Sequence, residues 1–510
     1  MDDLSPRVRA LCDLDIAEVR EGGGRHEYDG QVQDLSPEGV RVGLSRLQEA
    51  ASAGGPSPDA HDDAHVRAFE KRAQTMLGDL ALHRRNPLLH LFAMDLACYD
   101  REYAPAAERD AARLAHLRAW PDAVDAAVAA LDQVSAPVAA ALLGGLRGLA
   151  AGIPAGAPPD VAAAARDAHA RLVSHIEHAT RTGDPDPALG GAALSSLMGN
   201  GEATQVDLGA LAERADAERS RLLARLAEDC ARLDGSRPPL EVARELVRDH
   251  PSAAGVIEAA RDWTERAIEF TRERDLVPYH DGVCLVGLAP ESRRWGMAMM
   301  APSAPGEPDG PSWYHITPPD PAWSPEQAEE WLEVFSATTL PGITVHEVAP
   351  GHFSHYRALR RAPGPVRQTL HSYSFVEGWA HYAEELCVEE GFLADDPRFA
   401  IGIWLEGLVR VIRLTCALGV HSAGMTVEEG ARRFEADTHL TGPAALSEAR
   451  RATFDPTYGR YTWGKLEIMD LREQARKQWG PAFSLSRFHA ALMRLGSPPL
   501  GLMQTALDGG

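Results

Sequence analysis

Apolar residues recur at helical spacing through most of the chain, which predicts a mainly α-helical protein. Pro- and Gly-rich breaks at 54–58, 152–159 and 183–191 divide this pattern into separate helices. Ala-, Leu- and Arg-rich stretches with Asp or Glu at helical spacing predict helices over 66–83, 88–103, 107–132, 159–181, 207–233 and 239–274.

Residues typical of β-strands gather in one region after residue 280. They lie at 282–287, at 296–300 and at 313–317, the last after a Pro/Gly loop. We expect a small sheet there, and two interpretations of it stay open. Its edge either pairs with an extended substrate backbone or is only part of a structural hairpin.

A helix start is predicted directly after this region. Ser324 stands at the N-cap, Pro325 at the first helical position and Gln327 at the third, which makes a capping box. We expect the helix to continue through Glu329 to Thr338.

Composition limits the class of protein. At 510 residues the chain is long enough for roughly two to four domains or one large two-lobed unit. Hydrophobic residues at 45% and charged residues at 25% are ordinary for a globular protein. The net charge of −23 argues against nucleic acid or an anionic membrane as a partner. The six cysteines are scattered without C-x-x-C pairing, which indicates reduced thiols.

The lack of a secretory signal and of a membrane span in the sequence predicts a soluble, cytoplasmic protein. The acidic run Met1 to Pro6 lacks the basic start and apolar core of a secretory signal. The most apolar stretch, Ala136 to Ile153, is rich in Ala and Gly and contains Arg147, so it does not predict a membrane span.

The run HEVAPGH over 346–352 places two possible zinc ligands and a carboxylate base within seven residues. The usual H-E-x-x-H motif sets its histidines four residues apart on one helical face. Here the spacing is six, which in a regular helix leaves His346 and His352 roughly 120° apart. Pro350 and Gly351 permit a kink or bulge that absorbs two residues, because proline cannot donate the helical hydrogen bond and glycine tolerates unusual backbone shapes.

A second cluster, EGWAHYAEE over 377–385, supplies candidates for a third ligand. Glu377, His381 and Glu384 lie at i, i+4 and i+7 and share one helical face, although a solvated charged face is the plainer interpretation. We choose Glu377 as the third ligand and Glu384 as a residue that orients a ligand histidine. His381 is either a pocket residue or structural. His355 is a rival ligand, ranked lower because it would be a third ligand from one distorted helix.

These two motifs resemble the signature pair HExxPGH and EGWAxYxE of the bacterial domain of unknown function DUF885. Further blocks of similarity run from about residue 240 to Pro498-Pro499-Leu500. The resemblance implies a zincin-like metallopeptidase of the gluzincin type, largely helical and with a deep cleft. It also implies zinc on His346, His352 and Glu377 with Glu347 as the general base, and the preference for Glu377 over Glu384 rests partly on it.

The C-terminal block offers residues that could stabilise negative charge on a reacting carbonyl oxygen. Tyr461 could donate its phenol to that oxygen, while Arg472 or His489 could bind a substrate carboxylate or assist the same charge. For Tyr461 and His489 a structural role is the commoner alternative, because buried aromatic residues with a polar end are frequent in cores.

Together these observations predict a zinc-dependent hydrolase that cleaves peptide or amide bonds of short peptides. One alternative is a metal-dependent tailoring enzyme of small-molecule or peptide biosynthesis, because fold and motif do not fix the substrate. Another is a non-catalytic protein with a structural zinc, against which the carboxylate beside His346 argues.

The expected architecture is a mainly α, two-lobed, zincin-like fold with a small sheet beside the active-site helix. Residues 1–270 would form an N-terminal helical lobe and residues 271–510 a catalytic lobe, with the cleft between them. Such a cleft limits access, so we expect short peptides or small amides as substrates.

Overall fold

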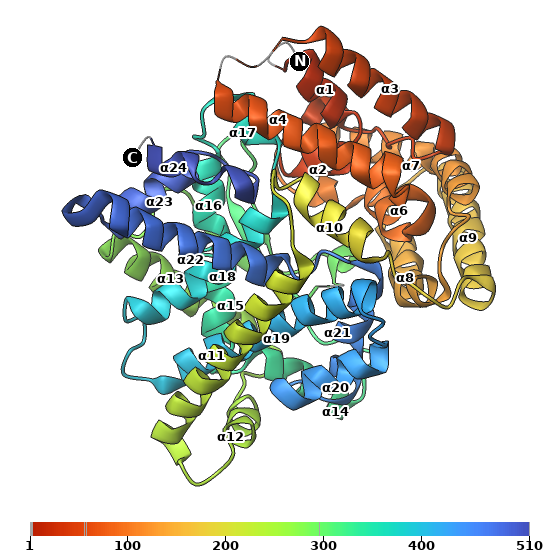
Figure 1. Cartoon of the computed structure of the whole chain (residues 1–510). Helices are drawn as coiled ribbons and strands as arrows, with labels where there is room; N and C mark the ends of the chain where they lie inside the picture. The colour runs from red at the N-terminus through yellow and green to blue at the C-terminus, as the bar shows by residue number, and fades with distance from the viewer. Residues whose placement is uncertain (1–3, 56, 58, 295, 509–510) are drawn as a thin grey trace.

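A computed structural model describes residues 4–55, 57, 59–294 and 296–508 and shows a mainly α-helical protein with one three-stranded sheet (Figure 1). Residues Met1 to Asp3 of the acidic N-terminal run, and two positions of the break predicted at 54–58, lie outside the described residues.

The helices of the first half are short at the N-terminus and long thereafter. They are α1 (Pro6–Cys12), α2 (Ile16–Glu21), α3 (Pro37–Ala53), α4 (Ala60–Ala73), α5 (Leu82–Arg85), α6 (Pro87–Met94), α7 (Ala106–Ala130), α8 (Ala136–Gly148), α9 (Pro159–Thr182), α10 (Gly191–Asn200), α11 (Leu208–Asp234), α12 (Pro239–Leu246) and α13 (Val256–Glu273). A π-helical turn, Gln74–Asp79, extends α4.

The second half begins with the strands and then is helical again. Its elements are β1 (Cys284–Leu288), β2 (Ala298–Ala301), β3 (Ser312–Ile316), α14 (Pro325–Leu332), α15 (Leu340–Glu347), α16 (His352–Leu359), α17 (Gly364–Thr369), α18 (Tyr373–Glu389), α19 (Pro397–Ser422), α20 (Val427–Asp437), α21 (Gly442–Phe454), α22 (Arg460–Trp479), α23 (Leu485–Met493) and α24 (Thr505–Asp508).

The Ala-rich region forms a compact helical layer. On α7 the buried residues Leu117, Trp120 and Val124 follow helical spacing, and they pack against α9, whose buried face includes Leu172 and Ile176. Small alanines between the large side chains let the two long helices approach closely, which explains why this Ala-rich sequence makes a stable pair.

Three predicted helices are shorter in the structure than in the sequence pattern. The stretch 239–274 divides into α12 and α13 around Pro251, and 88–103 gives way to a 3-10 turn after Met94. The capping box at Ser324 is present, but α14 ends at Leu332 and a 3-10 turn follows instead of helix to Thr338. Proline accounts for the first division, because it has no N–H for the helical ladder.

The three strands form a mixed sheet in the order β1-β3-β2. β1 pairs with β3 in parallel and β2 pairs with β3 in antiparallel register. Tyr314 and Ile316 of β3 are buried against Leu340 and Ile343 of α15, so the sheet lies beside the helix that carries His346. This confirms a small sheet in the predicted region.

The main core joins residues from both predicted lobes. It runs from Leu194 of α10 to Leu507 of α24 and includes the contact of α11 with α19. Two further clusters are formed mainly by buried hydrophobic residues that precede residue 180. The boundary at residue 270 stays a prediction, but burial groups α10 to α13 with the second half.

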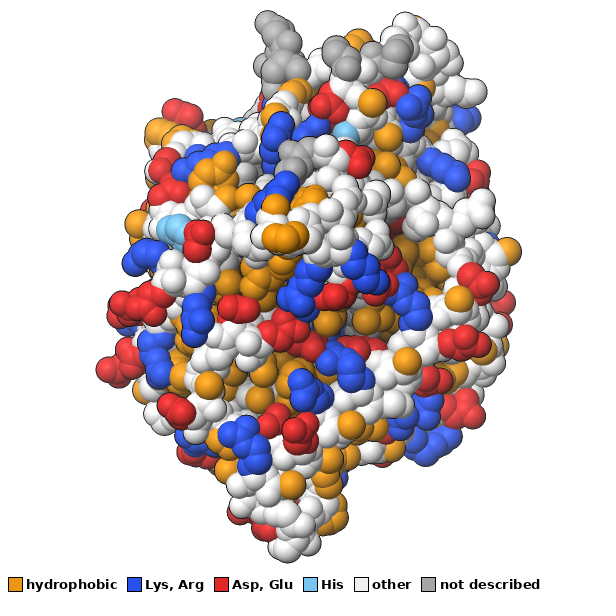
Figure 2. Space-filling model, turned by 60° about the vertical axis from the view of Figure 1, so that its left-hand side comes forward, with side chains coloured by type: hydrophobic (Ala, Val, Ile, Leu, Met, Phe, Trp, Pro, Cys, Tyr) orange, Lys and Arg blue, Asp and Glu red, His pale blue; other side chains and the backbone are white. Residues whose placement is uncertain are grey.

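Acidic and basic side chains are interspersed over the face of the molecule shown in Figure 2, where hydrophobic side chains gather toward the centre. All six cysteines are free. Within the described part of the chain, no helix combines the length and apolar character that crossing a membrane requires.

Candidate metal centre

The motif HEVAPGH lies where one helix ends and another begins. α15 ends at Glu347 and α16 begins at His352, with residues 348–351 as the link. The sequence predicted a bulge within one helix, and the structure instead has a complete break. The link is tied back to α15 by Gly351 N–H, which donates to the Val345 carbonyl at 3.2 Å. The break brings the rings of His346 and His352 to a centroid distance of 4.8 Å.

Gly351 is required by close backbone contact. A Cβ on this residue would lie 1.9 Å from the carbonyl oxygen of His346, well inside contact distance. A larger residue would therefore push the two histidines apart, which explains glycine in this motif.

The second motif forms the middle of α18 and holds the first motif in place. The indole N–H of Trp379 donates to the carbonyl oxygen of Pro350 at 2.9 Å. Gly378 lies against Gly464 of α22, where a Cβ on Gly378 would come within 2.5 Å of the Gly464 carbonyl carbon. Each of these residues of the EGWA sequence thus has a contact that fixes α18 in position.

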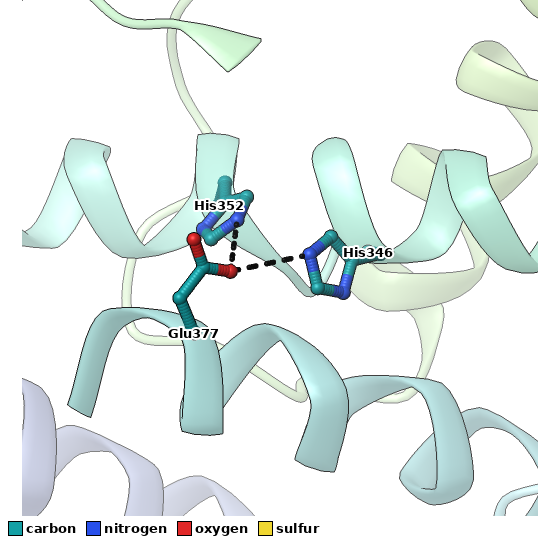
Figure 3. A group of neighbouring side chains, drawn as sticks. All are labelled: His346, His352 and Glu377. Carbon is teal, nitrogen blue, oxygen red and sulfur yellow. Dashed lines mark ion pairs between the residues drawn. The ribbon is translucent and has the colours of Figure 1, made fainter. Parts of the chain in front are cut away.

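Glu377 projects from α18 between the two histidines (Figure 3). Its Oε2 lies 3.6 Å from Nε2 of His346 and 3.5 Å from Nε2 of His352. The three potential ligand atoms all lie within 4.8 Å of one another. These separations are too long for good hydrogen bonds. Two atoms bound to one tetrahedral zinc are about 3.4 Å apart, so the Glu377 distances fit a shared cation.

The surroundings of the three ligands also fit a metal site. His346 is 5% exposed and His352 is 8% exposed. Oε2 of Glu347 and Nδ1 of His352 are buried without a hydrogen-bond partner among the described residues. Buried polar atoms are normally satisfied, so these two indicate a site for water, substrate or an ion.

Glu384 contacts His346 from two turns further along α18. Its Oε1 lies 2.6 Å from Nδ1 of His346, so the ring donates from Nδ1 and leaves Nε2 free for a metal. Arg410 of α19 neutralises the same carboxylate, with 3.1 Å between Nη2 and Oε1. The sequence predicted that Glu384 orients a ligand histidine, and this contact with His346 is the geometry that such a role requires.

The charges in the site reinforce one another. Burial alone would lower the pKa of His346, but the carboxylates of Glu377 and Glu384 beside its two ring nitrogens outweigh burial and raise that pKa to about 9. Burial would raise the pKa of Glu377, yet the two histidines hold it well below its ordinary range. The ionised Glu377 carboxylate therefore faces a protonated His346, and a bound cation would replace the proton on Nε2.

Two other histidines near the motifs do not join the cluster. His381 lies against Oε2 of Glu384 at 3.3 Å, and burial lowers its pKa to about 4. Nε2 of His355 lies 3.3 Å from the Ser497 hydroxyl, and its ring packs on Phe375. Both are buried structural neighbours of the site.

Tyr461, at the start of α22, is brought to the site. Its ring stacks on His346 with centroids 6.3 Å apart. Burial raises the pKa of its phenol, and the charge of Glu377 raises it further. The phenol is therefore protonated at neutral pH and available as a hydrogen-bond donor.

Arg472 and His489 are not brought to the site. Arg472 forms a bidentate ion pair with Glu389 and donates to the Tyr382 hydroxyl at 3.2 Å. His489 lies between that same hydroxyl at 2.9 Å and the Leu276 carbonyl at 2.6 Å. These contacts place both residues in the core beside Tyr382, and neither lines the cavity that contains the ligands.

That cavity has a volume of about 2580 Å³, well beyond the ~300–1,000 Å³ of a small-molecule pocket. Its walls come from both halves of the chain, including α6, α8, α19, α21 and the edge strand β2. Glu347, His346, His352, Glu377 and Tyr461 all line it.

Arginines on the cavity wall escaped the sequence analysis: Arg410, Arg413, Arg451 and Arg460. A signal for two of them was available. Glu406, Arg410 and Arg413 share one face of a helix that is otherwise apolar, and buried charge in such a helix indicates a specific partner.

The family described as "Bacterial protein of unknown function (DUF885)" matches residues 19–507. Among solved structures, the chain is similar to a "putative lipoprotein of unknown function" from Shewanella oneidensis, with 19% identity, a TM-score of 0.75 and coverage of 98% of this chain and 97% of that one. It is also similar to a "putative lipoprotein" from Colwellia psychrerythraea, with 16% identity, a TM-score of 0.80 and coverage of 99% and 96%. These likenesses establish a shared fold. No curated protein matches the chain.

The two structural neighbours contradict the predicted cytoplasmic location, because both are described as lipoproteins. Composition could not reveal this. A lipid anchor is attached to single residues and leaves the charge and hydropathy of the folded part unchanged, so an acidic, span-free sequence is compatible with either location.

Proposed function

Since the chain belongs to the DUF885 family of bacterial proteins of unknown function, we propose that it is a zinc-dependent hydrolase of peptide or amide bonds, related to the gluzincin peptidases. The observation that carries the proposal is the convergence of His346, His352 and Glu377 from three helices beside a buried, unpartnered carboxylate oxygen of Glu347.

His346 and His352 would hold zinc through their Nε2 atoms and Glu377 through Oε2. The described residues offer three ligands, as in catalytic sites, whereas closed structural sites use four. When bound, zinc supplies a Lewis acid that polarises a carbonyl and lowers the pKa of a coordinated water.

Glu347 is the base in this proposal. Its side chain is 8% exposed and lines the cavity next to the ligands, so its unpartnered Oε2 can accept a proton from the attacking water. The same oxygen then returns that proton to the leaving amine, which cannot depart as an anion.

Tyr461 stabilises the negative oxygen that develops on the carbonyl. Its protonated phenol lies over His346 at the edge of the cluster, where a donor favours the transition state over the uncharged substrate.

Strand β2 gives an extended substrate a place to bind. It is an edge strand, so one side of its backbone has no strand partner in the sheet, and its residues Ala298, Met299 and Met300 line the cavity. A peptide added along this edge would form main-chain hydrogen bonds whatever its side chains. The cavity between the two halves would then form a cleft suited to short peptides.

The test compares the protein with its Glu347→Gln variant on a mixture of peptides and metabolites analysed by mass spectrometry. We expect hydrolysis to fall on the order of 10²- to 10⁴-fold while zinc content is unchanged, because the amide cannot accept the proton. Glu473→Gln, on the exposed side of α22, is the matched control and should keep full activity.

Normal turnover by Glu347→Gln would refute the base assignment. Removal of zinc by a chelator should abolish hydrolysis, and added zinc should restore it. Activity indifferent to the chelator would refute the metal proposal.

A further inference from the structure

Several charged side chains lie near Tyr461 on the cavity wall. We call Arg413, Arg451 and Arg460, with Glu448 and Asp455, the arginine cluster. All five line the cavity that contains Glu347. The cluster draws on α19, α21 and the start of α22, so it forms the cavity wall next to the proposed catalytic residues.

The cluster has more positive than negative groups. Arg413 forms a bidentate pair with Glu448, with contacts of 2.7 and 2.8 Å. Asp455 is shared by Arg451, at 3.1 Å, and Arg460. Three guanidinium groups therefore face two carboxylates. Arg410, the neighbouring arginine, pairs with two carboxylates, Glu384 and Glu406. With these three groups included, the network holds four guanidinium groups and four carboxylates.

The arginine cluster lies close to the proposed reacting centre. The guanidinium carbon of Arg413 is 5.5 Å from the centre of the Tyr461 ring, which in turn stacks on His346. Arg451 and Arg460 also act electrostatically on the Tyr461 phenol. A group held by this cluster would lie within about three or four extended residues of the bond presented to Glu347.

Arg450 gives this wall its excess positive charge. Its guanidinium is exposed on the same cavity wall, and its side chain has no ion-pair partner among the described residues. This excess occurs in a chain with a net charge of −23. Guanidinium groups bind carboxylates with two parallel hydrogen bonds, so this wall suits an anionic end of a substrate.

We propose that the arginine cluster binds a carboxylate of the substrate next to the bond that is cleaved. This inference rests on the proposed function and makes it more specific. The carboxylate is either the free C-terminus of a short peptide, which would make the protein a carboxypeptidase, or an acidic side chain beside the scissile bond.

Paired peptide libraries separate these two sources on the unmodified protein. N-acetylated tripeptides are supplied as free acids and as C-terminal amides, and hydrolysis of each is followed by mass spectrometry. A free C-terminus as the ligand predicts kcat/KM at least about tenfold higher for the acids. An acidic side chain predicts equal rates for acids and amides but a similar preference for Asp- or Glu-containing members. No preference for either kind of carboxylate would overturn the proposal.

Arg460→Gln tests the cluster directly. It removes one guanidinium and leaves Arg451 on Asp455, so that buried carboxylate keeps a partner. We expect KM for the preferred peptides to rise on the order of ten- to a hundredfold with kcat and zinc content little changed. Arg460→Lys should recover part of the preference, because it restores charge without the bidentate geometry. Arg476→Gln, further along α22 and outside the cavity, is the matched control.

A binding measurement separates failure of this proposal from failure of the proposed hydrolase. Calorimetric titration of zinc-loaded Glu347→Gln with N-acetyl-trialanine and with its C-terminal amide needs no turnover. We expect the acid to bind more tightly than the amide, and this difference to disappear in the double variant that also carries Arg460→Gln. That result would support carboxylate binding by the arginine cluster even if no peptide were cleaved. Equal binding of the acid and the amide would exclude a free C-terminus as the ligand. Together with no preference for Asp- or Glu-containing peptides in the libraries, it would exclude the proposal. If Arg460→Gln does not fold, the acid and amide comparison on the unmodified protein decides.

Discussion

Glu384 is the residue on which the orientation of His346 depends, although it would not touch the metal. It contacts His346 Nδ1 at 2.6 Å and is itself held by Arg410.

The Glu384→Gln variant keeps the shape of the side chain but loses its negative charge, so the imidazole of His346 becomes a weaker metal ligand. We expect zinc affinity to fall on the order of 10- to 100-fold, as measured by competition with a chromophoric chelator.

Glu389→Gln on the same helix is the control for this experiment, because the Glu389 carboxylate pairs with Arg472, away from the proposed metal ligands. It should bind zinc as tightly as the unmodified protein. Equal zinc affinity in Glu384→Gln would show that His346 is held without the carboxylate.

Helical geometry explains which candidate residues the sequence could identify. Glu377 and Glu384 lie two turns apart on one face of α18, and the structure places both beside the histidines. Tyr461 and Arg472 also share a face of α22, because eleven residues are about three full turns, but they are separated by about 16 Å along the axis. One site cannot contain both. The position of His489 depended on packing against Tyr382 from a helix distant in sequence, which no local pattern could reveal.

The crossing of α18 and α22 depends on glycine. Gly378→Ala would place a methyl group 2.5 Å from the Gly464 backbone. Alanine normally stabilises a helix by about 1 kcal/mol relative to glycine. Overpacking costs about 1–3 kcal/mol, so we expect a net loss of unfolding free energy in urea titrations together with weaker zinc binding.

Gly144 of α8 is the matched control, because a Cβ there would meet no atom within 4 Å. Gly144→Ala should therefore raise the free energy of unfolding by roughly 0.5–1 kcal/mol. If Gly378→Ala were also stabilising, the two helices would have room to move apart and the close contact would not be needed.

At the level of elements, the sequence predicted where the chain is helical better than where helices stop. Pro350 and Gly351 indicated a distortion between His346 and His352, but a bulge and a complete break satisfy the same local constraints. The choice was made by contacts from elsewhere, such as the Trp379 hydrogen bond to Pro350 and the packing of Val348 against the sheet.

Buried neutral histidines make the stability of the whole molecule dependent on pH. Burial lowers the pKa of His90 and His489 to about 4 and that of His116 to about 3. In the unfolded chain they titrate near about 6.5, so between the two values the unfolded state binds more protons than the folded state. The free energy of unfolding is therefore highest above pH 6.5 and falls as the pH is lowered toward 4.

Each such histidine contributes up to about 1.4 kcal/mol per pH unit in this window. At His26 and His346, neighbouring carboxylates outweigh burial and raise the pKa. These two histidines therefore lower the free energy of unfolding as the pH rises, but they are fewer than the buried neutral ones. Urea unfolding of the metal-free protein at several pH values would measure the slope, and His116→Gln should flatten it. A stability that is constant from pH 7.5 to 5 would contradict the prediction.

The arrangement of the two halves could not be read from the sequence. The mainly helical class and the small sheet follow from local periodicity and are confirmed. Which helices share a core depends instead on contacts such as α11 with α19, which join residues almost two hundred positions apart. Hydropathy shows that each of these helices has an apolar face but does not identify its partner.

The order of the site along the chain has a consequence for biosynthesis. A ribosome-bound chain that had emerged only as far as residue 377 would carry His346, His352 and Glu377, but α18 would lack the glycine surface of α22 against which it packs. Tyr461 and the last arginine of the cluster emerge only just before that surface. If the proposed metal site is correct, the nascent protein cannot form it until nearly the whole polypeptide has been translated, and metal uptake would follow synthesis.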